Sequence, residues 1–193
     1  MIPRWLRQKT NFATVRPMTQ PTTRLVLADG GVVAVRPLVP GDRAELAAAV
    51  ERLSEHSRYL RFAAPKPRLT ERELDHLVAV DHHGSEALVA FDPATGRGIG
   101  VARYAPVPGA PRVADVAVTV ADEWQGRGLG TALLARLVAR ARAEGHVALR
   151  ASVLAVNRAS LALLRRAGFR LRENGGTLLE LELDLRAAAT AAA

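Results

Sequence analysis

The stretch from residue 125 to residue 130 constrains the fold more than any other part of the chain. It reads QGRGLG, with three glycines in five residues, and stands directly before the helix pattern TALLARLVARARAEG. Because glycine inside a helix costs about 1 kcal/mol relative to alanine, this spacing favours a turn that leads into a helix start. Such a turn presents free backbone N–H groups at the positive end of the helix dipole. It therefore predicts a phosphate or pyrophosphate site.

Two well-known phosphate-binding motifs do not match this stretch. A P-loop is spelled G-x-x-x-x-G-K-[ST], and the stretch has no lysine. A dinucleotide-binding fingerprint requires G-x-G-x-x-G, but counting from Gly126 ends on Thr131 and counting from Gly128 ends on Leu133. We therefore expect neither a nucleoside triphosphate nor a dinucleotide. A glycine-rich turn without chemical meaning is the alternative that stays open.

Hydrophobic periodicity on both sides of the turn predicts the elements that hold it. Residues 112–120 alternate between two faces as a strand does, with Val113, Asp115, Ala117 and Thr119 on one face. Leu133, Leu134, Leu137, Val138 and Ala141 give the apolar stripe of a helix, which Gly145 ends. A further strand at 147–153 completes a strand–helix–strand unit, which predicts one parallel crossover.

The other segments predict antiparallel strands and covering helices. Residues 86–92 and 98–107 flank a short turn, which is typical of antiparallel pairing. Thr70 and Glu73 form a capping box at a helix start, and Asn157 is a good N-cap for the helix RASLALLRRAG. The expected fold class is α/β (α+β), a mixed central sheet flanked by helices.

Length and composition limit the organisation of the chain. Its 193 residues suggest one domain. We expect a flexible N-terminal extension over residues 1–22, a single domain over residues 23–186 and a disordered, alanine-rich tail over residues 187–193. No stretch approaches the roughly 20 apolar residues of a membrane span, and the N-terminus lacks the apolar core of a signal peptide. The expected location is cytoplasmic, with no membrane partner.

Composition also excludes several kinds of site. There is no cysteine, so thiolate metal sites and cysteine nucleophiles are absent. His82 and His83 invite a metal interpretation, but adjacent histidines seldom bind one metal and no further ligands are spaced for it; we expect no metal. The formal net charge is +8, but the basic residues are scattered without interleaved aromatics, so we do not expect nucleic-acid binding.

The glycine stretch and its surroundings resemble the GNAT-type N-acetyltransferases. QGRGLG matches the family motif [QR]-x-x-G-x-[GA], and NRASLALLRRAGF follows with Asn157 and the pair Gly168-Phe169 at the family spacing. LADGGVVAVRPL, SRYLRF, LVAVDHHGSEALVAF and VADVAVTVADEWQGRGLG look like the acetyltransferase domain of bacterial protein lysine acetyltransferases. The resemblance covers about residues 23–186. It implies the GNAT fold, in which a parallel strand pair splays apart within the mixed sheet.

The resemblance also implies acetyl-CoA as the cosubstrate. The pyrophosphate would lie on the N–H groups of residues 127–131, with Arg127 adding charge, and the pantetheine arm would pair with the end of the strand at 112–120. Asn157 would approach the pantetheine, unless it serves only as an N-cap. The cofactor-binding residues implied are Val118, Thr119, Val120, Gln125, Gly126, Arg127, Gly128, Leu129, Gly130, Thr131, Asn157 and Ser160.

Acetyl transfer to an amine needs a base, because a lysine amine has a reference pKa of about 10.4. Related lysine acetyltransferases carry a glutamate in the pattern E-[FV]-A-V-x-V, and here Asp115 takes that position with a side chain one methylene shorter. We expect Asp115 to act as general base, directly or through water. The alternative is a structural pairing with Arg103 or Arg150. Glu86, also in a position that resembles this subgroup, at the start of a strand, is the second catalytic candidate.

The acceptor and the general acid are less constrained. Many GNAT enzymes use a tyrosine as general acid where this chain has Leu164, so water would protonate the leaving thiolate. The amine acceptor implied by the resemblance is a protein lysine. A small-molecule amine, a protein N-terminus, or a non-catalytic acyl-CoA-binding module are the alternatives. The chain is expected to be a monomer or a homodimer.

Overall fold

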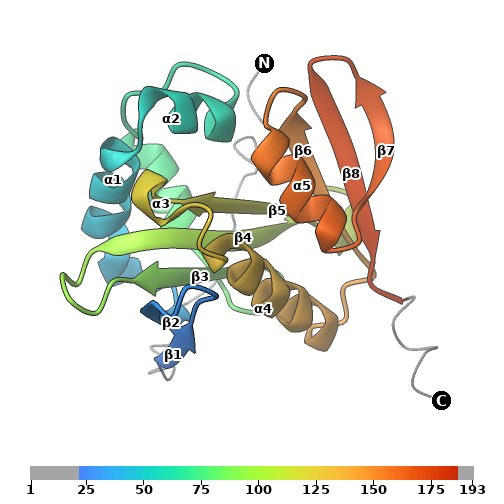
Figure 1. The fold of residues 1–193 in the computed structure, drawn as a ribbon. Coiled ribbons are helices and arrows are strands. Elements are labelled where there is room, and N and C mark those ends of the chain that lie inside the picture. The colour runs from blue at the N-terminus through green and yellow to red at the C-terminus, as the bar shows by residue number, and fades with distance from the viewer. Residues whose placement is uncertain (1–21, 187–193) are drawn as a thin grey trace.

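The computed structural model describes residues 22–186 (Figure 1). The expected domain over residues 23–186 falls within this range. The expected alanine-rich tail, and all but the last residue of the expected N-terminal extension, lie outside the described residues.

In the described chain two strands precede three helices, three strands follow, and α4 and α5 lie on either side of β6 before the last two strands. The strands are β1 (Thr23–Val26), β2 (Val32–Pro37), β3 (Glu86–Phe91), β4 (Gly98–Val107), β5 (Ala110–Val120), β6 (Ala148–Leu154), β7 (Arg170–Gly175) and β8 (Leu178–Asp184). The α-helices are α1 (Arg43–Arg52), α2 (Glu55–Phe62), α3 (Glu71–Val78), α4 (Leu129–Ala143) and α5 (Arg158–Arg166). Two 3-10 turns, η2 (Pro40–Asp42) and η3 (Asp122–Trp124), precede α1 and the glycine stretch.

All of these strands belong to one mixed sheet in the order β1-β2-β3-β4-β5-β6-β8-β7. Among the described strands, β5 and β6 alone run parallel, and α4 makes the crossover between them. The neighbours on either side, including β3 with β4, are antiparallel. The predicted antiparallel hairpin and the predicted single parallel crossover are both confirmed.

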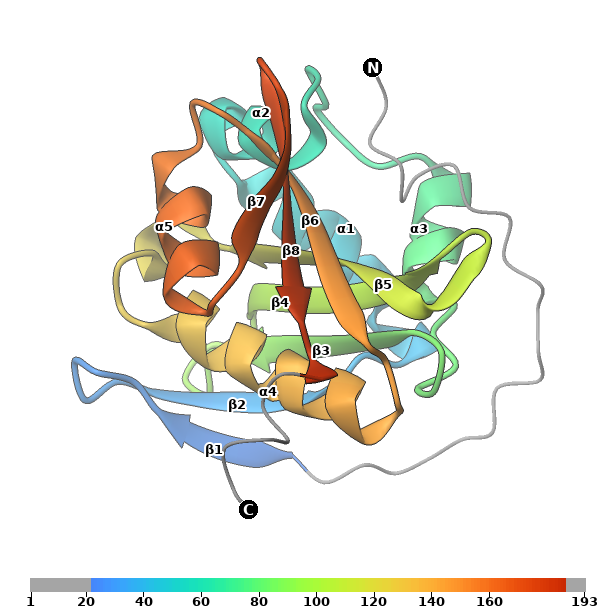
Figure 2. The same cartoon turned by 90° about the vertical axis from the view of Figure 1, so that its right-hand side faces the viewer.

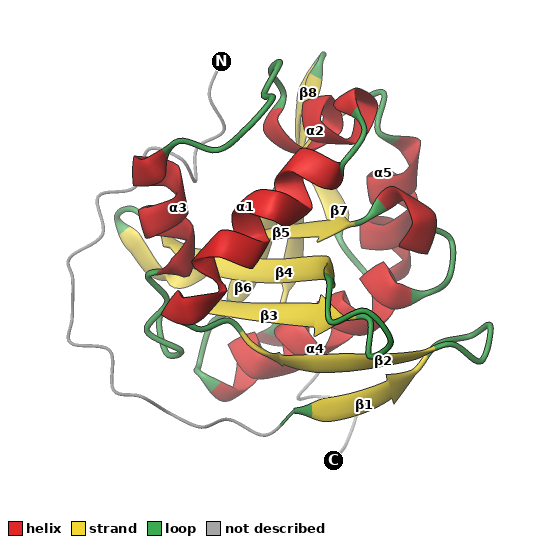
Figure 3. Cartoon of the chain, turned by 90° about the vertical axis from the view of Figure 1, so that its left-hand side faces the viewer, coloured by secondary structure: helices red, strands yellow, loops and turns green. Residues whose placement is uncertain are grey.

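Helices cover both faces of the sheet, and the sheet separates two hydrophobic clusters. Figure 3 looks onto the face covered by α1, α2 and α3, with α4 behind the sheet. The larger cluster lies under α4 and α5, and the smaller one lies under α1 and α3. Successive side chains of β5 point to opposite faces of the sheet. Ala114 and Val116 are buried in the larger cluster under α4, so the Asp115 side chain projects toward the face covered by α1.

The local signals predicted from sequence are present. The five apolar residues of the predicted stripe in α4 are all buried, and Gly145 follows the helix with a left-handed φ of 78°. Thr70 and Glu73 form the predicted capping box of α3, and the Asn157 side chain caps α5. No helix within residues 22–186 is long and apolar enough to cross a membrane.

Candidate functional site

The parallel strands β5 and β6 stay paired for only a short distance. Their register runs from Val113 opposite Ala148 to Asp115 opposite Arg150. Beyond that pair β5 continues along β4 to Val120, whereas β6 remains paired with β8. Figure 2 shows β6 and β8 running steeply away from β5. A wedge-shaped gap therefore opens in the sheet, and Asp115 lies at its apex.

The backbone of β5 turns hydrogen-bonding groups toward this gap. The N–H of Ala121, just beyond β5, donates to Ile99 O of β4, and backbone groups alternate sides along a regular strand. The N–H and C=O groups of Val116, Val118 and Val120 consequently face the gap. The Thr119 backbone faces β4 instead, so this predicted cofactor contact would have to use its side chain, which lies on the α1 face.

The glycine stretch forms a turn with left-handed backbone against the open end of the gap. Gly126 and Gly128 adopt left-handed φ values of 73° and 89°, a region that costs other L-residues about 1–2 kcal/mol. The first N–H bonded back into the turn is that of Ala132, which donates to Gly128 O. The N–H groups of Leu129, Gly130 and Thr131 precede it and have no acceptor within the helix.

The start of α4 also lies against the strand that borders the gap. A Cβ placed on Gly130 would lie 3.6 Å from Val120 Cγ2, 3.9 Å from Val118 Cγ1 and 3.5 Å from Leu163 Cδ2 of α5. The first turn of α4 contains no acidic residue, and its last turn contains Arg140 and Arg142. This distribution leaves the positive end of the helix dipole available to an anion.

Arg127 has a structural partner that the sequence did not reveal. Its Nε lies 2.5 Å from Asp29 Oδ2 in the turn between β1 and β2, and its guanidinium stacks 4.0 Å above the Trp124 ring. Asp29 also accepts a hydrogen bond of 2.9 Å from Gly31 N. The charge predicted to assist phosphate binding is therefore shared with a carboxylate, and the backbone N–H groups remain the main donors of the turn.

Gln125 and the preceding Asp122 connect the glycine turn to α2. The Gln125 amide donates to Val120 O at 3.2 Å and to Ser57 Oγ at 3.4 Å. Asp122 accepts hydrogen bonds from Ser54 and Ser57 at the start of α2. Burial opposes ionisation of this carboxyl, but the hydrogen bonds from Ser57 and Ser54 outweigh it and hold the pKa of Asp122 below its usual value. Gln125 thus forms part of the turn and also connects it to β5 and α2 through its side-chain amide.

Two arginines lie on the same face of the sheet as Asp115. Arg103 of β4 is in register with Ala117, two residues along β5 from Asp115, and Arg61 Nε donates to Thr119 Oγ1 at 2.9 Å. Burial lowers the pKa of Arg103 to about 10. Burial, together with repulsion from Arg103, lowers the pKa of Arg61 to about 9. Arg150, the other predicted partner of Asp115, donates to Glu182 at 2.8 Å.

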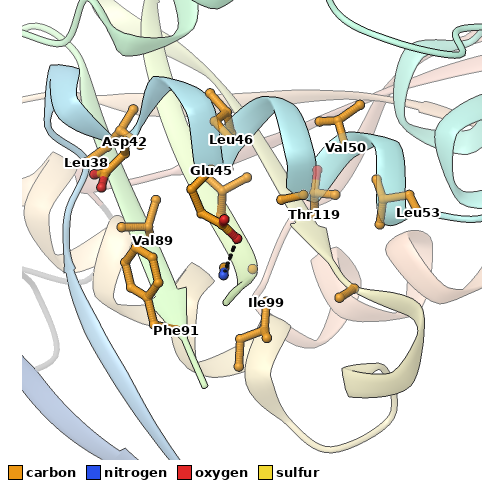
Figure 4. Close-up of a pocket in the computed structure, with 15 residues that line it drawn as sticks. Leu38, Asp42, Glu45, Leu46, Val50, Leu53, Val89, Phe91, Ile99 and Thr119 are labelled. Atoms are coloured by element: carbon orange, nitrogen blue, oxygen red, sulfur yellow. Dashed lines mark hydrogen bonds between the residues drawn. The ribbon is translucent and has the colours of Figure 1, made fainter. Parts of the chain in front are cut away.

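A hollow runs beneath α1 toward this group of residues. One cavity of about 50 Å³ lies between α1 and strands β3 to β5 and reaches Thr119. Figure 4 shows apolar side chains of α1 lining it, with the Glu45 carboxylate accepting from Gly98 N at 2.7 Å. A neighbouring cavity of about 40 Å³ is lined by Arg61, Arg103 and Thr119. The apolar hollow thus borders the face on which Asp115 lies.

Glu86 occupies the opposite face of the sheet from Asp115. Its carboxylate is 2% exposed and accepts from Arg140 Nε of α4 at 3.1 Å and from Ala87 N at 2.9 Å. His82 Nδ1 lies 2.6 Å from Glu86 Oε1. These contacts account for Glu86 as a buried group that attaches β3 to α4. The structure does not bring the two predicted catalytic carboxylates together.

The start of α5 follows β6 and borders the far side of the gap. Asn157 is buried, and its Oδ1 accepts from Ser160 N at 3.0 Å. The predicted N-cap is therefore confirmed, and the Asn157 side-chain amide nitrogen is the group left for a ligand contact. Leu164 is buried in the α4 cluster. Its hydrocarbon side chain has no proton to donate.

Sequence reasoning missed the residues that hold the glycine turn from outside. Asp29, Ser54 and Ser57 come from distant parts of the chain, and Ser57 is separated by 68 residues from Gln125. Asp122 stands near the motif, but an acidic residue after a strand is by itself an ordinary loop feature. Among the described residues, no group of three or more His, Asp or Glu side chains could hold a metal ion.

Comparison with known proteins identifies the family. Residues 48–169 match the model of the Acetyltransferase (GNAT) family. The chain belongs to this family, and its open mixed sheet with one splayed parallel pair is the GNAT fold. It is an acetyl-CoA-dependent acetyltransferase.

Three individual proteins show the extent of the similarity. An acetyltransferase of Pseudomonas aeruginosa is 34% identical over 74% of this chain and 77% of that protein. The acetyltransferase Pat of Mycolicibacterium smegmatis is 31% identical over 78% of this chain, which spans only 45% of Pat. The crystal structure of the GNAT domain of S. lividans PAT is similar with a TM-score of 0.78 and 32% identity, covering 84% of this chain and 96% of that one.

The role of Glu86 can be tested by separating stability from turnover. Glu86→Ala removes a buried carboxylate from its cationic partner, so the free energy of unfolding should fall by about 3 kcal/mol in chemical denaturation. Glu71→Ala is the control, because Glu71 is 82% exposed and pairs with Arg43 at the surface; it should cost less than about 1 kcal/mol. Unchanged stability with a collapse in turnover would show that Glu86 is catalytic instead.

The glycine turn gives a second test. In Gly128→Ala an L-residue must adopt the left-handed backbone conformation, at a cost of about 1–2 kcal/mol. Because this cost disfavours the shape of the turn that binds the ligand, acetyl-CoA binding should weaken by about 5- to 30-fold. Gly145→Ala carries a comparable strain at the other end of α4, since Gly145 has a φ of 78° with nothing near its would-be Cβ. Titration calorimetry should find acetyl-CoA affinity unchanged in this control. Equal losses in both variants would mean that the turn has no special part in binding.

Proposed function

We propose that this chain transfers the acetyl group of acetyl-CoA to the side-chain amine of a protein lysine, with Asp115 as the general base. The observation that carries the proposal is the place of Asp115 at the last paired position before β5 and β6 separate. The sequence resemblance to bacterial protein lysine acetyltransferases supports the choice of acceptor.

The proposed acetyl-CoA site consists of backbone groups around the gap. The pyrophosphate is held by the N–H groups of Leu129, Gly130 and Thr131 at the positive end of α4. The pantetheine arm extends along β5 and pairs with the groups of Val118 and Val120 that face the gap. Gln125 already occupies Val120 O, which leaves the Val118 backbone as the main partner of the arm near the thioester.

The reaction needs a proton acceptor and an oxyanion donor near the apex of the gap. The amine nitrogen forms a bond to the thioester carbonyl carbon, and the carbon–sulfur bond then breaks. The amine proton passes to the Asp115 carboxylate, directly or through one water, and the N–H of Val118 stabilises the oxyanion. Water protonates the leaving thiolate, because Leu164 cannot.

The face of the sheet that carries Asp115, called the acceptor face below, also carries cations that favour this direction of proton transfer. Arg61 and Arg103 lie on the face of β4 and β5 that carries Asp115. Because like charges repel in a partly buried site, a nearby guanidinium disfavours an ammonium ion and favours the neutral amine that attacks.

Substitution of the proposed base tests the mechanism. Asp115→Asn should lower kcat by about 10²- to 10⁴-fold while the dissociation constant for acetyl-CoA stays the same. Asp115→Glu restores a carboxylate with the length found in related enzymes and should retain substantial activity. Asp184→Asn changes an exposed aspartate on the same sheet and serves as the control. Full turnover by Asp115→Asn would exclude Asp115 as the base.

The acceptor requires a direct comparison of amines. We expect CoA release from acetyl-CoA to be fastest with folded proteins that expose lysines, and mass spectrometry should locate the acetyl group on a lysine side chain. Faster turnover of small amines, or acetylation confined to protein N-termini, would replace the lysine proposal. Acetyl-CoA binding without turnover of any amine would favour a non-catalytic acyl-CoA-binding module.

A further inference from the structure

The start of α2 is tied to the segment just before the glycine turn. Asp122 accepts a hydrogen bond from Ser54 N at 2.9 Å, one from Ser54 Oγ at 2.9 Å and one from Ser57 Oγ at 2.6 Å. Ser54 is also the N-cap of α2, because its hydroxyl accepts from Ser57 N at 3.1 Å. A single carboxylate in η3 therefore collects three donors from the first turn of a helix that lies 65 to 68 residues earlier in the chain.

Apolar packing alone holds α2 weakly. Of its eight residues only Phe62, the last, is buried, and Tyr59 is among the exposed large side chains. Polar contacts therefore have a large share in fixing its position. Besides the bonds to Asp122, Arg61 near the end of the helix donates to Thr119 Oγ1 at 2.9 Å. Both ends of α2 are thus attached to the segment that runs from β5 into the glycine turn.

Gln125 connects these hydrogen bonds to the glycine turn, where acetyl-CoA is proposed to bind. Its amide donates to Ser57 Oγ and to Val120 O, and it is the first residue of the glycine stretch. A ligand that fixes the glycine turn also fixes Gln125 and Asp122, to which α2 is bonded. At its other end α2 places Arg61 on the face of β5 that carries Asp115. The helix α2 is therefore bonded both to the segment of the glycine turn and to the face of β5 that carries Asp115.

We infer that Asp122, through Ser54 and Ser57, is a positioning residue that makes the placement of α2 depend on occupancy of the glycine turn. Acetyl-CoA bound at the turn stabilises η3 and Gln125, and these hold α2 over the acceptor face. This inference rests on the donor site proposed above. It assigns no contact with substrate to Asp122, Ser54 or Ser57.

Hydrogen exchange with and without acetyl-CoA tests the coupling. In the unmodified protein, saturating acetyl-CoA should slow exchange in the first turn of α4 and also in α2. Ser57→Ala removes the hydroxyl that joins Asp122 to Gln125. In this variant the α4 protection should persist, whereas α2 in the bound protein should exchange about tenfold faster, as expected for the loss of one hydrogen bond to a charged group.

Two further variants separate coupling from a general loss of structure. Ser57→Thr retains the hydroxyl and should restore the α2 response to acetyl-CoA. Ser85→Ala breaks a similar bond, from Ser85 Oγ to Asp81 Oδ1 at 2.8 Å, in the loop before β3, and should leave the response unchanged. Loss of the response in Ser57→Ala together with its recovery in Ser57→Thr supports the inference.

The remaining outcomes overturn it in distinguishable ways. Protection of the α4 start without protection of α2 in the unmodified protein shows that the donor site is right and the coupling is wrong. Equal α2 protection in Ser57→Ala and the unmodified protein also shows that the coupling is wrong. No protection at the α4 start shows that acetyl-CoA does not bind at the glycine turn, and then the coupling falls with the proposed donor site.

Discussion

The early end of the parallel pairing between β5 and β6 is the constraint on which the rest of the site depends. A parallel pair that stayed in register would satisfy its backbone groups and leave no opening in the sheet. Here pairing stops at Asp115 and Arg150, because β5 follows β4 while β6 follows β8. The gap turns part of the β5 backbone toward a ligand strand, places a half-buried acidic side chain at its apex, and has the start of α4 at its wide end.

Polar contacts from distant segments hold the glycine turn at the edge of this gap, in addition to the apolar packing of α4. The turn between β1 and β2 fixes Arg127 through Asp29, and α2 fixes η3 through Asp122. The core beneath α4 supports the helix itself, since the predicted apolar stripe is fully buried. Packing therefore determines where the helix lies, whereas hydrogen bonds from two distant segments determine the shape of the turn at its start.

What could be predicted from sequence follows from the range of the interactions involved. Strand alternation around Asp115, the stripe of α4 and the cap at Asn157 depend on neighbours within a few residues, and the structure confirms these elements. The partner of Arg127 lies 98 residues away, and no periodicity or spacing encodes such a contact. Glu86 shows the converse: the resemblance of its position to the family suggested chemistry, while its burial against Arg140 became visible only with α4 in place.

The pairing of Arg127 with Asp29 has a consequence for how the enzyme captures its donor. A guanidinium already neutralised by a carboxylate contributes little long-range attraction, because the two fields largely cancel beyond a few ångströms. In the proposed site, recognition of the pyrophosphate then depends on amide dipoles at contact distance. Arg127 should consequently contribute little to the ionic-strength dependence of capture, and the contacts to the pyrophosphate would come from backbone N–H groups, including those of Leu129 and Thr131.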